Sequence, residues 1–403
     1  MLQCYLDSLH TEMVCSILKA ALEVIVEEDM MITPQARHRV LAGGLPFPHT
    51  MALVCRRWRD IVSSTSELWT RIFYVSPQVE VQWMRSQLER TGNHPLNLTI
   101  INQRGPYFGI SSILSCIAPH VQRLRSLRIL DFYGAFDRRQ FDMLTGHAPR
   151  LECLRLTDSS CLKYFLIPLS QFKLDCPALR ILDINEDVVD NFDHQWLKNS
   201  LTHIEFMTIS FDGSGHHPIS GSQAVALSRA LNAVPRRIPC LTLNNLQLPS
   251  IISMKEVGIK FGAEKVILRA CIDALDVIDD NCQTIALHRC NSIHELYHRL
   301  LPSSNSLELD WCAGKGMWRF FNTRTWDGGT VTITNSHSSC IKVILHLLGA
   351  PFKHQSCSLW PRVTTLKLVA KGNFVMDVPL TILKAMINSR RGATGQENLA
   401  KTD

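Results

Sequence analysis

The chain has 403 residues, of which 46% are hydrophobic and 19% charged, and its formal net charge at pH 7 is +6. This composition is that of a folded protein rather than a disordered one, and the length favours an elongated repeat domain plus a small module over one small core. The positive charge is spread out with no long run of lysine and arginine, which argues against a nucleic-acid groove.

Signals for secretion or membrane insertion are absent from the sequence pattern. The apolar stretch from Met13 to Val26 is interrupted by Lys19 and Glu23, which opposes a signal peptide. No uninterrupted apolar window reaches the length of about 18 residues that a membrane span needs. The 14 cysteines are scattered, and several lie inside apolar segments, as is typical of buried, reduced thiols. These features predict a protein of the cytoplasm or nucleus that binds no membrane.

The first 75 residues predict a small helical module. Apolar residues between positions 11 and 25 recur at spacings of three and four, which indicates one face of a helix. Residues 27–50 interrupt this pattern with an acidic run, glycines and prolines, and so predict a loop insertion. Helix is expected again from Thr50, as N-cap, through Val62.

A third short helix is expected directly after Val62. Ser64 and Glu67 have the spacing of a capping box, and Leu68 and Trp69 follow as an apolar pair. Three short helices make a marginal domain, so their remaining apolar surface is expected to pack against a partner protein or the rest of the chain.

Two segments of this module resemble the F-box. The first is LHTEMVCSIL at residues 9–18, which is similar to the opening of that motif, with His10 where the family usually has proline. The second is VCRRWRDIV at 54–62 with TSELW at 65–69, which resembles the second half in its fungal, basidiomycete-type form. The segment WMRSQLERTGNHPLNLTI at 83–100 continues in the same style.

The resemblance implies a substrate-recognition subunit of an SCF-type cullin–RING ubiquitin ligase, which is not itself an enzyme. The F-box would dock on a Skp-family adaptor and through it on a cullin, while the remainder would hold an unidentified target protein. The motif match assigns the adaptor-binding patch and its support to Leu9, Glu12, Ile17, Leu53, Val54, Cys55, Trp58, Leu68 and Trp69. The alternative is a repeat scaffold without a ligase role, in which these residues only form a helical cap.

From about residue 95, short strand-like runs recur with the pattern L-x-x-L-x-L. The clearest copies are 127–132, 151–156 and 179–184, at a period of roughly 20 to 36 residues that indicates leucine-rich repeats. Looser copies lie at 201–207, 240–246, 265–268, 284–287, 306–309, 330–333 and 363–369. The inward leucines of one unit need neighbouring units to bury them, so the pattern predicts a stacked solenoid.

The predicted fold is therefore α/β, with a small N-terminal helical F-box-like module followed by an irregular leucine-rich-repeat-like solenoid. The module spans 1–75, a linker or first irregular repeat spans 76–125, the repeat region spans 126–390, and a disordered tail spans 391–403. An ordinary α/β fold, or a solenoid distorted after about residue 250, are the structural alternatives.

One enzymatic motif is present. His294, Glu295 and His298 form H-E-x-x-H, the zinc-protease signature. The extended form of that motif would place Gly at 301 and His at 304, where this chain has Leu301 and Ser304. The stretch also fits the outer helix of a repeat. No metal or cofactor is therefore predicted, and a zinc metalloprotease remains the remote alternative.

Overall fold

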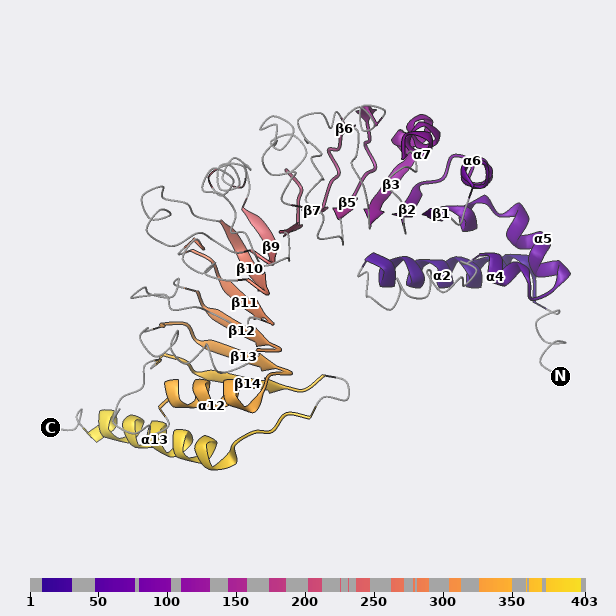
Figure 1. Cartoon of the computed structure of the whole chain (residues 1–403). Helices are drawn as coiled ribbons and strands as arrows, with labels where there is room; N and C mark the ends of the chain where they lie inside the picture. Colours follow the sequence, from indigo (N-terminus) through magenta and orange to yellow (C-terminus); the bar gives the residue numbers. More distant parts are fainter. Residues whose placement is uncertain are drawn as a thin grey trace. The chain divides into compact units, whose positions relative to one another are not determined.

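The computed structural model divides the chain into two compact units, residues 1–179 and 180–403 (Figure 1). The structure describes residues 9–30, 48–76, 80–102, 110–130, 144–157, 174–185, 202–211, 225, 231, 237–246, 262–271, 278–279, 281–289, 304–312, 326–349, 360, 362–371 and 375–399. Among these residues, no helix is long and apolar enough to cross a membrane.

Unit 1 begins with the helical module that the apolar spacing predicts. Its elements are α2 (Thr11–Met30), α4 (His49–Ala52), α5 (Arg56–Ser64) and the 3-10 helix η1 (Ser66–Trp69). Helix α2 runs to Met30, so it enters the segment 27–50 that was expected to be a loop.

The helix expected from Thr50 to Val62 is interrupted at residues 53–55, and Cys55 is the N-cap of the second part. This residue has extended dihedrals, φ −160° and ψ 172°, and its Sγ accepts a hydrogen bond from the Trp58 backbone N–H at 3.5 Å. The predicted capping box is wrong: Thr65 precedes η1, the Ser64 hydroxyl donates backwards to the Asp60 carbonyl, and η1 has no side-chain cap.

A parallel sheet follows directly. In unit 1, β1 (Arg71–Ser76), β2 (Leu96–Asn102), β3 (Leu124–Leu130) and β5 (Cys153–Thr157) pair in chain order. Helices α6 (Val81–Arg90), α7 (Ile110–Ile117) and η2 (Ala118–Arg123) lie between strands, and β4 (Gly146–His147) pairs with β6 (Leu174–Asp175). The described residues between 76 and 125 thus form strands and helices in alternation.

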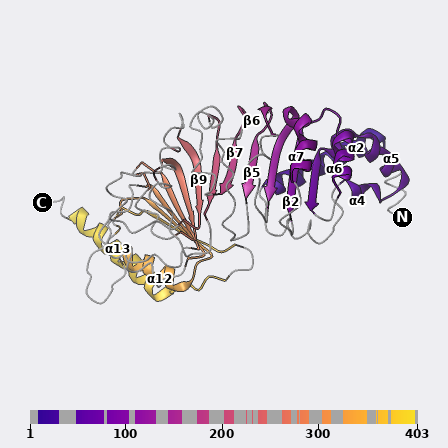
Figure 2. The ribbon, with the colours of Figure 1, turned by 45° about the horizontal axis from the view of Figure 1, so that its top comes forward.

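Unit 2 is a second run of parallel strands, each hydrogen-bonded to the next (Figures 1 and 2). They are β7 (Ile181–Asn185), β8 (Phe206–Ser210), β9 (Ile238–Asn244), β10 (Ala263–Arg269), β11 (Thr284–His288), β12 (Ser306–Asp310), β13 (Thr330–Thr334) and β14 (Thr365–Val369). Strands β9 to β14 keep a continuous register, which excludes distortion of the sheet after residue 250. The helical region is therefore followed by a parallel β-solenoid.

Several strands of unit 2 have one buried and one open face, as their period-two pattern predicts. In β12, Leu307 and Leu309 are buried, whereas Ser306, Glu308 and Asp310 on the other face are half-exposed. The stacked inner residues form the core of the solenoid.

The strands β9 to β13 all end in the same way. The next residue has a left-handed backbone, and its N–H donates to the last carbonyl of the neighbouring strand, as Asn245 does to Arg269 at 2.8 Å. After β10 and β12, the left-handed residue is itself followed by a cysteine. The thiol of this cysteine donates to a carbonyl of the preceding strand: Cys271 to Leu243 at 3.1 Å and Cys312 to Leu287 at 3.4 Å. The ten described cysteines are all free thiols, as their apolar settings predict.

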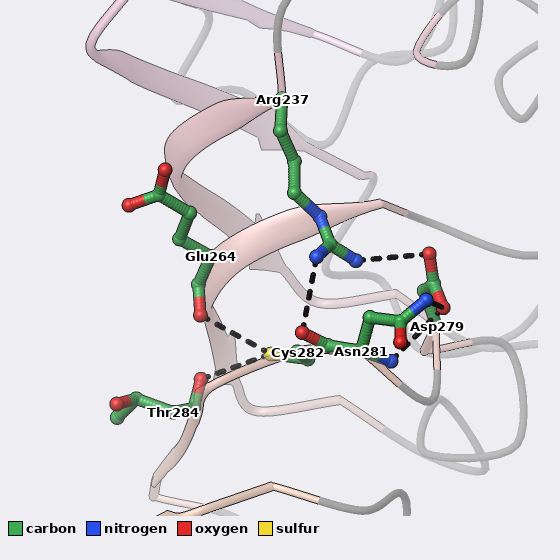
Figure 3. Close-up of polar contacts among 6 residues, drawn as sticks. All are labelled: Arg237, Glu264, Asp279, Asn281, Cys282 and Thr284. Carbon is green, nitrogen blue, oxygen red and sulfur yellow. Dashed lines mark hydrogen bonds and ion pairs between the residues drawn. The ribbon is translucent and has the colours of Figure 1, made fainter.

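The loop before β11 shows how one turn of the solenoid is fixed at the opposite end of the strands (Figure 3). The Arg237 guanidinium pairs with the Asp279 carboxylate at 3.0 Å and donates to the Asn281 carbonyl at 3.1 Å. The buried Cys282 thiol donates to the carbonyls of Glu264 and Thr284, and burial raises its pKa.

Unit 2 ends with α12 (Ser338–Leu347) and α13 (Leu380–Leu399), which contact each other. The Arg390 guanidinium donates to the carbonyls of Leu348, Trp360 and Val363, and so holds α13 in place. Helix α13 continues nine residues into the segment 391–403 that was expected to be disordered, because elongating an anchored helix is far easier than starting one.

Candidate functional site

The helical module has a core of its own. It is formed by apolar side chains from three helical segments, α2, α5 and η1. The core residues are Val14, Leu18 and Leu22 from α2, Trp58, Ile61 and Val62 from α5, and Leu68 and Trp69 from η1. The spacings of four along α2 and of three and four along α5 place these side chains in a row on one face of each helix.

Trp69 connects this core to the sheet of unit 1. Its Nε1–H donates to the Val62 carbonyl at 2.8 Å, the His49 ring meets it edge-on at 4.9 Å, and the Arg90 guanidinium of α6 lies 4.8 Å above it. The next residue, Thr70, accepts a hydrogen bond from the Asn97 N–H at 2.8 Å. Module and sheet are therefore joined without a flexible linker.

Polar contacts reinforce the module at its surface. Lys19 and Glu67 form an ion pair between α2 and η1, and the hydrogen bond from Lys19 lowers the pKa of the Glu67 carboxyl. The Arg57 guanidinium donates to the carbonyl of Leu9 at the start of the chain's described part. Both contacts join segments far apart in the sequence, and so fix how α2 packs on α5 and η1.

The structure separates the nine candidate docking residues into two groups. Trp58, Leu68 and Trp69 are buried in the core, and Leu9 and Cys55 pack against it half-buried. Glu12, Ile17, Leu53 and Val54 are exposed, the three apolar ones by 50%, 64% and 50% respectively. The first group supports the module, and only the second is free to meet a partner.

One exposed apolar residue was missed in the sequence. Met13 is 51% exposed and precedes Ile17 by four positions, so the two share a face of α2 beside the buried row of Val14 and Leu18. The spacing of four was the available signal. Met13, Ile17, Leu53 and Val54 are hereafter called the exposed apolar set.

The H-E-x-x-H motif, His294 to His298, lies outside the described residues. Within the described part of the chain, no group of three histidine, cysteine or acidic side chains could hold a metal ion.

Two half-buried histidines of unit 1 have lowered pKa values. Burial, and next the charge of Arg90, lower the pKa of His49; burial, and next Arg123, lower that of His120, whose Nδ1 lies 3.0 Å from the Arg123 guanidinium. Since both folded-state pKa values lie below the ordinary 6.5, the unfolded chain binds protons more readily. The stabilisation by the neutral rings is present above pH 6.5 and is lost as pH falls through the folded pKa values.

We therefore expect unit 1 to melt at progressively lower temperature below about pH 6.5, and His120→Gln to flatten this dependence. Circular dichroism melts between about pH 5 and pH 8 measure it. His10→Gln, at an exposed position, is the matched control and should leave the slope as in the wild type. An unchanged slope in His120→Gln would assign the pH dependence to other groups.

The comparisons with known proteins bear on this module. The model of the F-box-like family matches residues 49–75, which span α4, α5, η1 and nearly all of β1. F-box-like domains are in general ubiquitin-ligase adaptor modules that bind Skp-family proteins, and they are typically not enzymes. No curated protein and no solved structure matches the chain.

Proposed function

We propose that this protein is the substrate-recognition subunit of an SCF-type cullin–RING ubiquitin ligase. In this proposal the helical module docks on a Skp-family adaptor, and through it on a cullin, while the solenoid, as an irregular leucine-rich-repeat array, holds a target protein for degradation in the cytoplasm or nucleus. The observation that supports it best is the exposed apolar set, because two of its members, Leu53 and Val54, lie inside the matched segment.

The backbone that carries Leu53 and Val54 is well defined. Their N–H groups donate to the carbonyls of Thr50 at 3.3 Å and Met51 at 3.2 Å, and the Arg59 side chain donates to the Ala52 carbonyl at 3.3 Å. Both side chains are therefore held outward at little further entropic cost on binding. Burying each against a partner would contribute about 1.5–3 kcal/mol.

The link between module and sheet suits an adaptor that must position its cargo. Trp69 and the Thr70–Asn97 hydrogen bond fasten the module to the first strands of unit 1, so a docked ligase core would meet a defined surface. A target held nearby then reacts at a raised effective concentration, which is how a non-catalytic subunit promotes transfer.

The test is capture of a purified Skp-family adaptor by the Leu53→Glu/Val54→Glu double variant. Placing two carboxylates at an apolar contact should weaken binding about 100-fold or more, measured by titration calorimetry. Val375→Glu, at a strongly exposed apolar residue of unit 2, is the matched control and should bind like the wild type. Undiminished binding of the double variant would refute this docking surface. If the wild-type protein itself does not bind the adaptor, the alternative of a repeat scaffold without a ligase role would be favoured.

A further inference from the structure

The C-terminal ends of β10, β11 and β12, which are neighbours in the sheet, carry three exposed side chains. They are Arg269, Arg289 and Trp311, hereafter the strand-end patch. Register places Arg269 beside His288 and His288 beside Asp310, with Arg289 and Trp311 one residue further along their strands. Figure 1 shows the arrowheads of these neighbouring strands gathered along one edge of unit 2.

The backbone holds Arg289 and Trp311 in the left-handed region, each with φ +54°. Their N–H groups donate to the carbonyls of Asp310 at 2.9 Å and Thr334 at 3.1 Å, so both turns are fixed by the neighbouring strand. The same turn ends every strand from β9 to β13, so its role here is to fix the backbone that carries these two side chains. Trp311 is 45% exposed on this fixed backbone.

The charge of the patch favours an acidic ligand. Among the described residues at these strand ends, the two arginines are accompanied by one carboxylate, Asp310, which lies 3.2 Å from His288 Nε2. The next ion pair on the open face, Lys265 with Glu308 at 2.7 Å, is neutral as a pair. The net charge of these described side chains is positive but small, and carboxylates lie among the basic groups. This arrangement suits isolated acidic side chains better than the continuous phosphates of a nucleic acid.

We propose that the strand-end patch binds an extended acidic peptide segment of a partner protein, with an apolar side chain on Trp311 and a carboxylate on Arg269, so that the segment passes Arg289 on the strand between them. Tryptophan and arginine dominate the binding energy of many protein interfaces. Adjacent strands lie about 4.8 Å apart, so the three strand ends span about 10 Å, the length of about three extended residues. The ligand should therefore carry Asp or Glu about three positions from its apolar residue.

That the segment belongs to a ligase target rests on the function proposed above, whereas the binding itself does not. The two are separable, because Leu53→Glu/Val54→Glu should keep peptide binding, and variants of the strand-end patch should keep adaptor binding.

The experiment is selection of a phage-displayed library of short random peptides on the full-length protein. The wild type should enrich sequences with Asp or Glu about three positions from Leu, Phe or Trp. A recovered peptide, synthesised with a fluorescent label, should bind the Arg269→Glu/Arg289→Glu variant at least about 30-fold more weakly, and Trp311→Ala about tenfold more weakly, by fluorescence anisotropy.

Arg362→Glu is the charge-matched control, since this exposed arginine precedes β14 and so lies at the opposite end of the strands. It should bind the peptide like the wild type. Absence of an acidic consensus, or equal peptide binding by the Arg269→Glu/Arg289→Glu variant, would overturn the proposal. Tighter binding of a labelled single-stranded oligonucleotide than of the selected peptide, lost in the same variant, would replace the peptide with a nucleic acid and overturn it as well.

Discussion

Trp69→Ala should lower the free energy of unfolding of unit 1 by about 3–5 kcal/mol, the usual loss for removing a buried tryptophan. The indole is buried in the module core, contacts the His49 ring and the Arg90 guanidinium, and donates to the Val62 carbonyl. Alanine would leave a cavity among these groups and would also loosen the module from β1. Urea denaturation followed by circular dichroism measures the loss.

Two further variants locate the source of this effect. Trp69→Phe keeps most of the apolar volume but removes the Nε1–H donor, so it should cost about 1–2 kcal/mol. Trp311→Ala removes the same side chain from an exposed position of unit 2 and should change stability by less than about 1 kcal/mol. A loss below about 1 kcal/mol in Trp69→Ala would contradict the tight junction between module and sheet.

Whether a residue of the module is buried or exposed decides which variants can test adaptor docking. Trp58, Leu68 and Trp69 fit the F-box motif as well as Leu53 does, yet substituting any of the three would disturb the core. Loss of adaptor binding in such a variant would follow from unfolding as readily as from a lost contact. Only the exposed apolar set separates the two causes.

The sequence predicts the solenoid well because its signal is local. Leucines alternating along a strand can only be buried on one face, and residues such as Leu154 and Leu182 lie there with 0% exposure. The break at Cys55 is harder to predict. The apolar spacing runs on through it, whereas in the structure α4 ends at Ala52 and the extended backbone of Cys55 precedes α5.

The exposed residues were the least predictable part. On α2, Ile17 and Leu18 are neighbours of similar chemistry, but one is half-exposed and the other buried, and this depends on how α2 packs against α5 and η1. The strand-end patch gave no signal either. Its left-handed positions carry arginine and tryptophan rather than glycine or asparagine, so the usual markers of such turns are missing.

Gly328→Ala should destabilise unit 2 by about 3 kcal/mol, at the upper end of the cost of overpacking a core. A Cβ at this position would lie 2.0 Å from Cζ2 of Trp326 and 2.5 Å from the Ser304 carbonyl oxygen. Trp326 cannot easily move aside, because it is buried, packs edge-on against Trp360 at 5.2 Å, and donates from Nε1 to the Ser304 hydroxyl at 3.2 Å.

Gly329→Ala is a control from the adjacent residue. There the nearest atom to the added methyl would be Thr364 Oγ1 at 3.9 Å, an ordinary contact, so the stability of unit 2 should change by less than about 1 kcal/mol. Chemical denaturation of the two variants side by side separates the steric clash from the general effect of replacing glycine with alanine. Equal stabilities would show that the Trp326 ring can move, and would contradict the rigid packing of Trp326 between Ser304 and Trp360.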